Sequence, residues 1–456
     1  MIRFGRLVVA LAALIGVVML IRRWGDAIAD RAGEMDPAHG ATLAVGLLLF
    51  GSWLFGRLFK AIALPKLSGY LVFGMLVGPD ALALIPQDQL PTLRAAETIA
   101  ISLIALIAGG EIELAFLRRA ARLILSIAIL QFVGVFLSVA GLVWALAPAV
   151  GLTSPDEPAV RLASAALAGA IATAASPAVF IAIMNEVRAR GDSVRASLSV
   201  MIAKDLGLIV LFTVIVAVAS AGLRGGQEDP EGAGVALGLA QHLLGSIAAG
   251  AVFGLVFAWY MHAVRAHLAI FVIVGCVAIA VVSRMLHLEA LIVALVAGLL
   301  MRNVWHERVG PVFDTMEDLS LPVYCVFFAV AGAKLDLGAL GAMWPAALAI
   351  VAVRAGGVWL TTDLGCRLAG QGPPLRTWIW AAFIPQAGVS VALITVVRST
   401  FEGHEFAATL YALVLATITF HELLGPILLR AGLVRLDAHD RAAGDSGAPP
   451  AEGTSG

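Results

Sequence analysis

The sequence predicts an all-α polytopic membrane protein with about 13–14 transmembrane helices, arranged as two inverted repeats that each contain a broken helix. Three observations predict this class. Hydrophobic residues make up 61% of the 456 positions and charged residues only 13%, roughly half the charged fraction of a soluble chain. Apolar runs of about 17–28 residues recur from end to end, and a helix of that length crosses a bilayer core. The runs are continuous rather than alternating, which excludes a β-barrel.

The predicted spans follow one another along the chain and are separated by short polar loops. They lie at about 5–22, 41–63, 68–87, 95–115, 121–148, 160–187, 196–222, 234–262, 266–283, 287–302, 317–338, 342–368, 375–398 and 406–430. We expect an extra N-terminal helix and loop at 1–40, a first inverted repeat at 41–222, a linker helix at 223–265, a second repeat at 266–430, and a disordered cytoplasmic tail at 431–456. Arg3 and Arg6 precede the first apolar run, as in a signal peptide. Without a small-x-small cleavage site, a retained helix is favoured.

Basic residues are distributed unevenly between the two sides of the predicted bundle. The N-terminus, the loops after even-numbered spans and the C-terminal tail hold about twice as many Lys and Arg residues as the other loops. Because positive charge marks the cytoplasmic side, we expect both termini in the cytoplasm and the protein in the cell (inner) membrane, surrounded by lipid. A net charge of −1 does not indicate nucleic acid as a partner. The three scattered cysteines match neither a disulfide framework nor a metal motif, and no cofactor is expected.

Three charged residues lie inside predicted spans, where an ionisable group costs at least ~2.5–3.5 kcal/mol. Lys204 and Asp205 are adjacent in the span 196–222, and Arg354 lies in the span 342–368. A buried carboxylate binds a dehydrated cation or a proton but hardly both, and that competition is the simplest chemical basis for antiport. The alternative is a structural ion-pair cluster that holds helices together. Other acids lie nearer span ends, and most are expected at the membrane interface: Glu97, Glu111, Glu113, Glu289, Asp363 and Glu422.

Two spans are interrupted at corresponding positions of the two predicted repeats. The span 160–187 carries Thr173, Ser176 and Pro177 near its centre, and the span 375–398 carries Pro385, Gln386 and Gly388 at similar depth. Proline removes a backbone hydrogen bond and frees a carbonyl. Matched interrupted spans are the best sequence indication of a transporter's ion site, because freed carbonyls and opposed helix ends supply ligands and partial charges there. The alternative is a pair of ordinary proline kinks, which membrane helices tolerate.

Several segments resemble motifs of one family in order and spacing. They are the stretch LPKLSGYLVFGMLVGP at 64–79, Gly110-Glu111, Thr173 to Pro177 followed by Asp205, Phe327-Phe328 with Gly332, Arg354, and Ile384 to Gly388. Across roughly 41–430 the chain resembles the cation:proton antiporter superfamily, which has the sodium/proton exchanger fold.

The resemblance implies a secondary antiporter that exchanges a monovalent cation, sodium or potassium, for protons. It further implies a homodimer in which a core domain carries the site across the membrane against a static scaffold, the elevator type of alternating access. On this basis Asp205 is the carrier carboxylate, and Thr173 and Ser176 are auxiliary ion ligands. Arg354 compensates helix-end charges, or pairs with an acid when the cation is absent.

Lys204 departs from the family pattern, which often has Asp, Asn or Gln before the carrier aspartate. Its ammonium group has three possible roles. It deprotonates as the cation binds, it turns away by about 100° around the helix and pairs elsewhere, or it marks altered transport or a sensor. Other classes remain as alternatives. A channel fits the paired broken helices less well than antiport does. An intramembrane aspartyl protease, the enzyme alternative, lacks its Gly-x-Gly-Asp pattern around Asp205 and Asp363.

Overall fold

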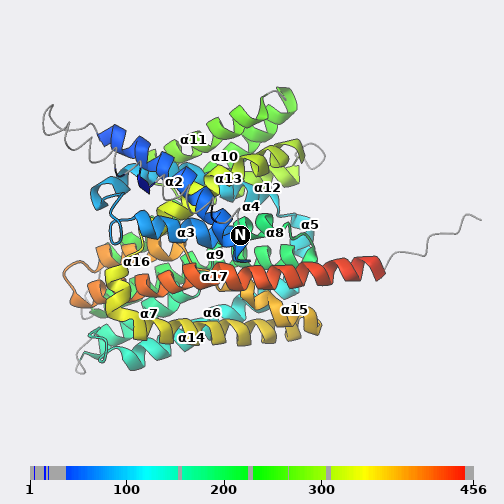
Figure 1. The fold of residues 1–456 in the computed structure, drawn as a ribbon. Coiled ribbons are helices and arrows are strands. Elements are labelled where there is room, and N and C mark those ends of the chain that lie inside the picture. The colour runs from blue at the N-terminus through cyan, green and yellow to red at the C-terminus, as the bar shows by residue number, and fades with distance from the viewer. Residues whose placement is uncertain are drawn as a thin grey trace, which may run out of the picture.

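The computed structural model describes residues 37–152, 157–223, 230–264, 267–304 and 310–446, together with four isolated positions near the N-terminus. All regular secondary structure within these ranges is helical, as the apolar runs predict. The elements are α2 (Pro37–Ala61), α3 (Lys66–Val77), η1 (Gln87–Leu93), α4 (Arg94–Gly110), α5 (Leu114–Arg119), α6 (Ala121–Leu146), α7 (Pro158–Ala172), α8 (Pro177–Val187), α9 (Asp192–Leu223), α10 (Pro230–Ala263), α11 (Leu268–Met285), α12 (Ala290–Val304), α13 (Gly310–Ala333), α14 (Leu337–Leu368), α15 (Pro373–Trp378), η2 (Ile379–Phe383), α16 (Gly388–Thr400) and α17 (Glu405–Ser446) (Figure 1).

Every predicted span from 41–63 onward contains a helix or a pair of broken helices, but the span predicted at 68–87 is too long, because α3 ends at Val77 and residues 78–86 are not helical. Within the described ranges, ten helices are long and apolar enough to cross a membrane, or eleven if the bent pair around residue 385 is one span. Two apolar helices are shorter, Lys66–Val77 and Ala290–Val304. Their rise of 1.5 Å per residue makes them about 18 and 22 Å long, less than the ~30 Å bilayer core. Apart from the four isolated positions, the predicted first span lies outside the described residues.

Helix α17 continues past the predicted end of the last span. We expected the chain to be disordered from residue 431, but the helix runs to Ser446, so the prediction is wrong for 431–446. The prediction relied on the polar composition of this segment. Leu433 and Leu436 within it are nevertheless buried, each 1% exposed. Asp437 accepts a hydrogen bond from a distant backbone N–H at 2.8 Å. Residues 447–456 lie outside the described ranges.

The helices pack into two bundles that lie one above the other in Figure 1. The first bundle contains α2, α3, α4, α10, α11, α12 and α13, and the second contains α6 to α9 and α14 to α17. Close backbone approach holds α4 against α12: a Cβ on Gly109 would lie 2.0 Å from the Leu295 carbonyl oxygen, and one on Gly298 would lie 2.1 Å from that of Leu106. Such small-residue contacts drive helix association where lipid removes the hydrophobic effect.

The chain visits the two bundles in the same order twice. Helices α2, α3 and α4 enter the first bundle, and the next three spans, α6, α7–α8 and α9, enter the second. After α10, the helices α11, α12 and α13 return to the first bundle, and α14, α15–α16 and α17 complete the second. Each predicted repeat therefore contributes three spans to each bundle, with both broken spans in the second bundle. The inverted symmetry of the repeats stays a prediction.

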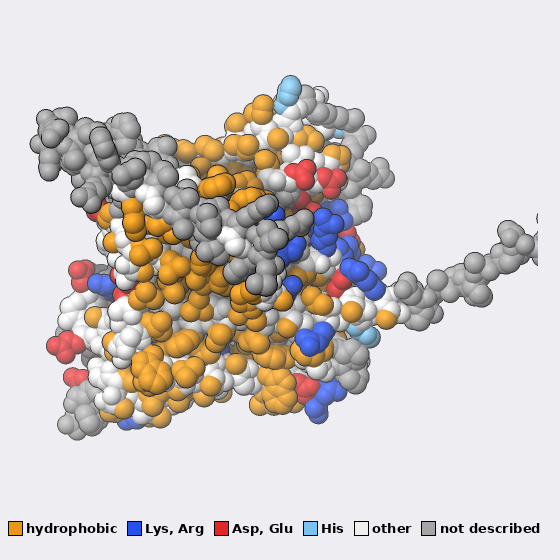
Figure 2. Space-filling view, in the orientation of Figure 1, with side chains coloured by type: hydrophobic (Ala, Val, Ile, Leu, Met, Phe, Trp, Pro, Cys, Tyr) orange, Lys and Arg blue, Asp and Glu red, His pale blue; other side chains and the backbone are white. Residues whose placement is uncertain are grey.

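Hydrophobic side chains cover the middle of the molecule in Figure 2, and basic side chains gather at the end from which α17 emerges. Many large apolar side chains of the protein face outward, as on a lipid-facing surface. On α6, for example, Ile129 is 58% exposed and Leu137 is 59% exposed. An exposed apolar belt of this kind suits a bilayer rather than water.

Candidate ion-binding site

The two broken spans cross at their unwound segments, residues 173–176 between α7 and α8 and residues 384–387 between η2 and α16. The Ser176 N–H donates to the Pro385 carbonyl oxygen at 3.0 Å. The Gln386 side-chain amide donates to the Ile171 carbonyl oxygen, also at 3.0 Å. The second span bends by 46° at the break. The sequence therefore predicted both interruptions, and the structure joins them by direct hydrogen bonds.

The two prolines occupy different places in these breaks. Pro177 is the first residue of α8, where its missing N–H costs no hydrogen bond because that position has no helical partner. The first helix is thus interrupted before Pro177 rather than kinked by it. Pro385 lies within the second unwound segment, and Gly388 begins α16 directly after it.

Arg354 on α14 is 0% exposed and ties the two breaks together. Its Nε donates to the Ala172 carbonyl oxygen at 2.7 Å and its Nη2 to that of Ala174 at 2.6 Å. On the other broken span, Nη1 donates to Ile384 at 2.8 Å and Nη2 to Phe383 at 3.1 Å. Ala172 and Phe383 are the last residues of α7 and η2, where helix ends carry partial negative charge, and Ala174 and Ile384 lie in the unwound segments that follow. Among the described residues no acid pairs with Arg354.

The carboxylate of Asp205 on α9 is buried and unpaired among the described residues. Both oxygens are buried, and neither has a hydrogen-bond partner among the described residues. Helix α9 packs against α7, α8 and η2, the elements that form the two breaks. A buried polar atom without a partner costs about 1–3 kcal/mol, and more when charged. The unsatisfied oxygens therefore have the chemistry of a site completed by a proton or a cation.

The two predicted hydroxyl ligands are buried at the first break. Thr173 Oγ donates to the Ala170 carbonyl oxygen at 2.8 Å, and Ser176 Oγ accepts from the Val179 N–H at 3.3 Å, so that it caps α8. Each oxygen keeps a lone pair for a further partner. No hydrogen bond joins either hydroxyl to Asp205 in the part of the chain that the structure describes.

Lys204 is 2% exposed and is hydrogen-bonded to α6 rather than to Asp205. Its ammonium donates to Gln131 Oε1 on α6, and Gln131 Nε2 donates to Thr362 Oγ1 on α14 at 2.7 Å. The ammonium also lies 5.4 Å from the centre of the Phe383 ring, a cation–π distance. Of the three roles considered for this lysine, the geometry matches the one in which it pairs elsewhere.

Residues 45–433 match the family described as "Sodium/hydrogen exchanger, transmembrane". The chain belongs to the sodium/hydrogen exchanger family. The match spans most of the sequence and agrees with the resemblance drawn from its motifs, which places this exchanger in the cation:proton antiporter superfamily. It is a family of transporters rather than enzymes.

Two solved structures of the sodium proton antiporter MjNhaP1 from Methanocaldococcus jannaschii share this exchanger's fold. The structure at pH 8 superposes with a TM-score of 0.64 at 18% identity and covers 88% of this chain and 99% of that one. The structure from an electron-microscopy map gives a TM-score of 0.66 at 18% identity, with coverages of 87% and 96%. No curated protein sequence matched the chain. At such identity the likeness establishes the fold alone.

Sequence reasoning missed Gln131 and the burial of Glu422 in this exchanger. Gln131 is the one side-chain amide in the apolar run 121–148, and that isolation is the signal that could have found it. Glu422 on α17 is one of the six acids of which most were expected at the interface, and it is 4% exposed, with no partner for its Oε2 among the described residues. Position along the span did not indicate this burial, which depends on the helices that flank α17.

Proposed function

We propose that this exchanger is a secondary antiporter that moves sodium or potassium against protons, with Asp205 as the shared binding group. The observation that carries the proposal is the buried Asp205 carboxylate, which has no hydrogen-bond partner among the described residues and lies on a helix packed against both crossed breaks. The related structures are described as those of a sodium proton antiporter. Sodium is thus the first cation to test, and potassium the second.

The chemistry follows from competition for one carboxylate. A proton neutralises Asp205 in its apolar surroundings, and a dehydrated cation replaces the proton and gains oxygen ligands from the same carboxylate. Thr173, Ser176 and those carbonyls of the unwound segments that Arg354 does not bind are the auxiliary ligands. Arg354 neutralises the helix-end carbonyls that it binds, so that they do not trap the cation. Binding is then exclusive, and each crossing of the site carries one kind of ion.

Alternating access is proposed to follow from the two bundles. Both breaks, Asp205, Lys204 and Arg354 belong to the second bundle. A movement of that bundle against the first would carry the whole site without taking it apart, which is the elevator arrangement. We place the exchanger in the cell (inner) membrane with both termini in the cytoplasm, supported by the basic side chains at the α17 end (Figure 2). We propose a homodimer built on the first bundle.

The test is cation-driven proton movement in proteoliposomes, read with a pH dye after sodium or potassium is added. Wild type responds to at least one of the two cations. Asp205→Asn, which keeps the shape but cannot take up the proton or balance a cation, loses at least about 100-fold in rate, since a dehydrated cation without a counter-charge is strongly disfavoured.

Asp363→Asn is the matched control, because Asp363 is also a span acid but is already paired with Arg367 and Arg376 at 2.7 and 2.8 Å. It keeps wild-type exchange. Equal loss in both variants, or retained exchange in Asp205→Asn, contradicts the assignment. Cation flux without counter-movement of protons would instead establish the channel alternative.

A further inference from the structure

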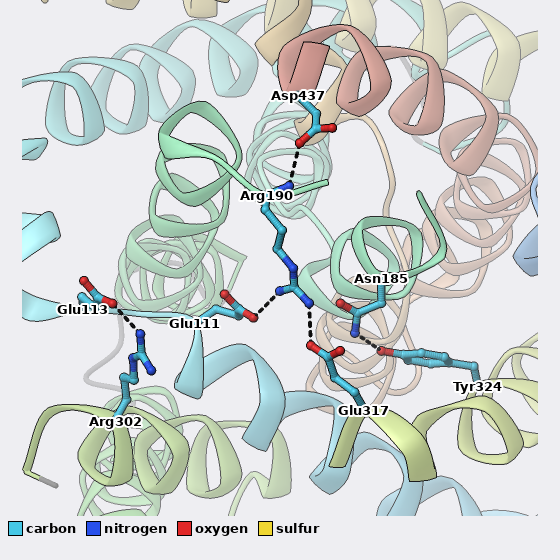
Figure 3. Close-up of polar contacts among 8 residues, drawn as sticks. All are labelled: Glu111, Glu113, Asn185, Arg190, Arg302, Glu317, Tyr324 and Asp437. Atoms are coloured by element: carbon cyan, nitrogen blue, oxygen red, sulfur yellow. Dashed lines mark hydrogen bonds and ion pairs between the residues drawn. The ribbon is translucent and has the colours of Figure 1, made fainter. Parts of the chain in front are cut away.

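The short connection between α8 and α9, residues 188–191, joins the second bundle to the first through one side chain. Arg190 Nη1 lies 2.7 Å from Glu111 Oε1, and Arg190 Nη2 lies 2.6 Å from Glu317 Oε1 (Figure 3). Glu111 follows the last residue of α4, and Glu317 lies on α13. Both acids therefore belong to the first bundle, and one planar guanidinium bridges two of its helices.

The backbone of this connection is fixed to its own bundle. The Arg190 N–H donates to Asp437 Oδ1 on α17 at 2.8 Å. Asp440, one turn further, accepts from the Ser193 N–H at 3.0 Å and from the Ser193 hydroxyl at 2.6 Å. Gly191 has φ +157°, and a Cβ there would lie 2.3 Å from Asp440 Oδ2, so only glycine fits. The backbone of Arg190 is thus bonded to the second bundle, and its guanidinium reaches the first.

Further contacts cross between the bundles at the same end, among them the ion pair of Arg195 on α9 with Glu113 at 4.0 Å and the hydrogen bond from Arg430 Nη1 on α17 to the Ala63 carbonyl oxygen at 2.5 Å. Asn185 Nδ2 on α8 donates to the Tyr324 hydroxyl on α13 at 3.3 Å. The Lys66 N–H at the start of α3 lies 3.0 and 3.1 Å from the two carboxylate oxygens of Glu186. The C-terminal end of α8 and the connection that follows it therefore form one polar seam between the bundles.

The two ion pairs suit a contact that opens and closes. The side chains of Arg190, Glu111 and Glu317 are 49, 24 and 39% exposed, so water replaces the lost bonds at small cost when they part. Burial lowers the pKa of Arg190, but its bonds to Glu317 and Glu111 outweigh that and raise the pKa above its ordinary value. The guanidinium therefore stays charged, and separation of the bundles rather than deprotonation releases it.

A plain solvated charge cluster is the competing interpretation. Other ion pairs of the molecule illustrate it: Lys334, directly after α13, pairs with Glu97 on α4 within the first bundle, and Arg376 and Asp363 both belong to the second. Arg190 differs because its backbone partner and its side-chain partners belong to opposite bundles. Such an arrangement changes whenever the bundles move relative to one another, and a pair within one bundle does not.

We propose that Arg190, with Glu111 and Glu317, is a latch that holds the two bundles together at the α17 end and so limits opening of the ion site on that side. The proposal rests on the proposed movement of the second bundle. Breaking the latch then favours the state in which the polar contacts between the two bundles are separated, while the second bundle itself remains folded.

Hydrogen–deuterium exchange of the full-length protein in lipid nanodiscs tests this without measuring transport. In Arg190→Gln, the Lys66 amide, which bonds across the seam, exchanges about threefold to tenfold faster, as expected from the loss of two half-exposed pairs. The amides of residues 190 and 193, which bond within the second bundle, keep their wild-type rates. In Arg190→Lys, which keeps the charge but lacks the planar set of donors, the Lys66 amide exchanges at a rate between those of wild type and Arg190→Gln.

Arg376→Gln is the matched control, because it breaks a pair inside the second bundle, and it leaves the Lys66 amide unchanged. Unchanged exchange at Lys66 in Arg190→Gln overturns the latch. Equal acceleration at residues 66, 190 and 193 also overturns it, because it would show local unfolding. In proteoliposomes the same variant alters the exchange velocity. Wild type without any cation–proton exchange would refute the proposed function, while the deuterium result would still decide whether the contact holds the bundles together.

Discussion

At the residue scale, the least expected feature is the pairing of Lys204 with an amide rather than with the neighbouring carboxylate. Adjacent helical positions point about 100° apart, so Lys204 faces α6 and α14, where Gln131 and Thr362 complete a short chain of hydrogen bonds. Asp205 faces elsewhere, and its oxygens have no hydrogen-bond partner among the described residues. Gln131 therefore takes the hydrogen bond of the Lys204 ammonium in place of the Asp205 carboxylate.

Replacing Gln131 tests this role. Gln131→Leu leaves the Lys204 ammonium buried without its acceptor, which costs about 1–3 kcal/mol or more, and makes Asp205 its nearest charged partner. We expect a lower melting temperature in detergent and a raised KM for the cation. Adding Lys204→Leu removes both polar groups and restores much of the stability. A double variant as unstable as the single one would contradict the pairing.

At the element scale, one arginine organises two broken helices. Four carbonyls at or just after the ends of helical segments on different spans accept hydrogen bonds from Arg354. Without it, these buried acceptors would lack partners and their partial charges would repel one another. The crossing is thus held by a side chain from a third helix as well as by the bond from Ser176 to Pro385.

We therefore expect Arg354→Lys to destabilise the fold although it keeps the charge. A lysine has three donors at one point and cannot reach both breaks as the planar guanidinium does. Each lost charged hydrogen bond is worth about 1.5–3 kcal/mol, so the melting temperature falls by several degrees or more, and amides at 173–176 and 384–387 exchange faster. Arg367→Lys on the same helix, with its side chain 60% exposed, is the control and changes neither measurement.

At the scale of the whole molecule, the chain alternates between two bundles, and α17 passes through the second to its far end. Its last turns are not a passive tail, because Asp437 and Asp440 hold the connection between α8 and α9 in place. The end of the chain thus fixes the position of Arg190, more than two hundred residues earlier.

Two truncated chains separate the effect of Asp437 and Asp440 on the connection between α8 and α9 from any effect of the residues after Ser446. A chain that ends after Leu436 loses both aspartates, and we expect faster deuterium exchange at residues 190 and 193 with the fold retained, since the buried part of α17 remains. A chain that ends after Ser446 keeps the bonds and behaves as wild type. If both truncations leave those amides protected, α17 does not hold the connection.

The sequence by itself determined the fold class, the approximate positions of the spans from residue 41 onward and both interruptions, because bilayer thickness and backbone hydrogen bonding restrict what an apolar run can form. It also singled out Asp205, Lys204 and Arg354, since charge is costly in lipid. Only the tertiary structure decided what each of these groups contacts. Packing brought Gln131 to Lys204, buried Glu422, and extended α17 to Asp437 and Asp440, because those outcomes depend on helices that are distant in sequence.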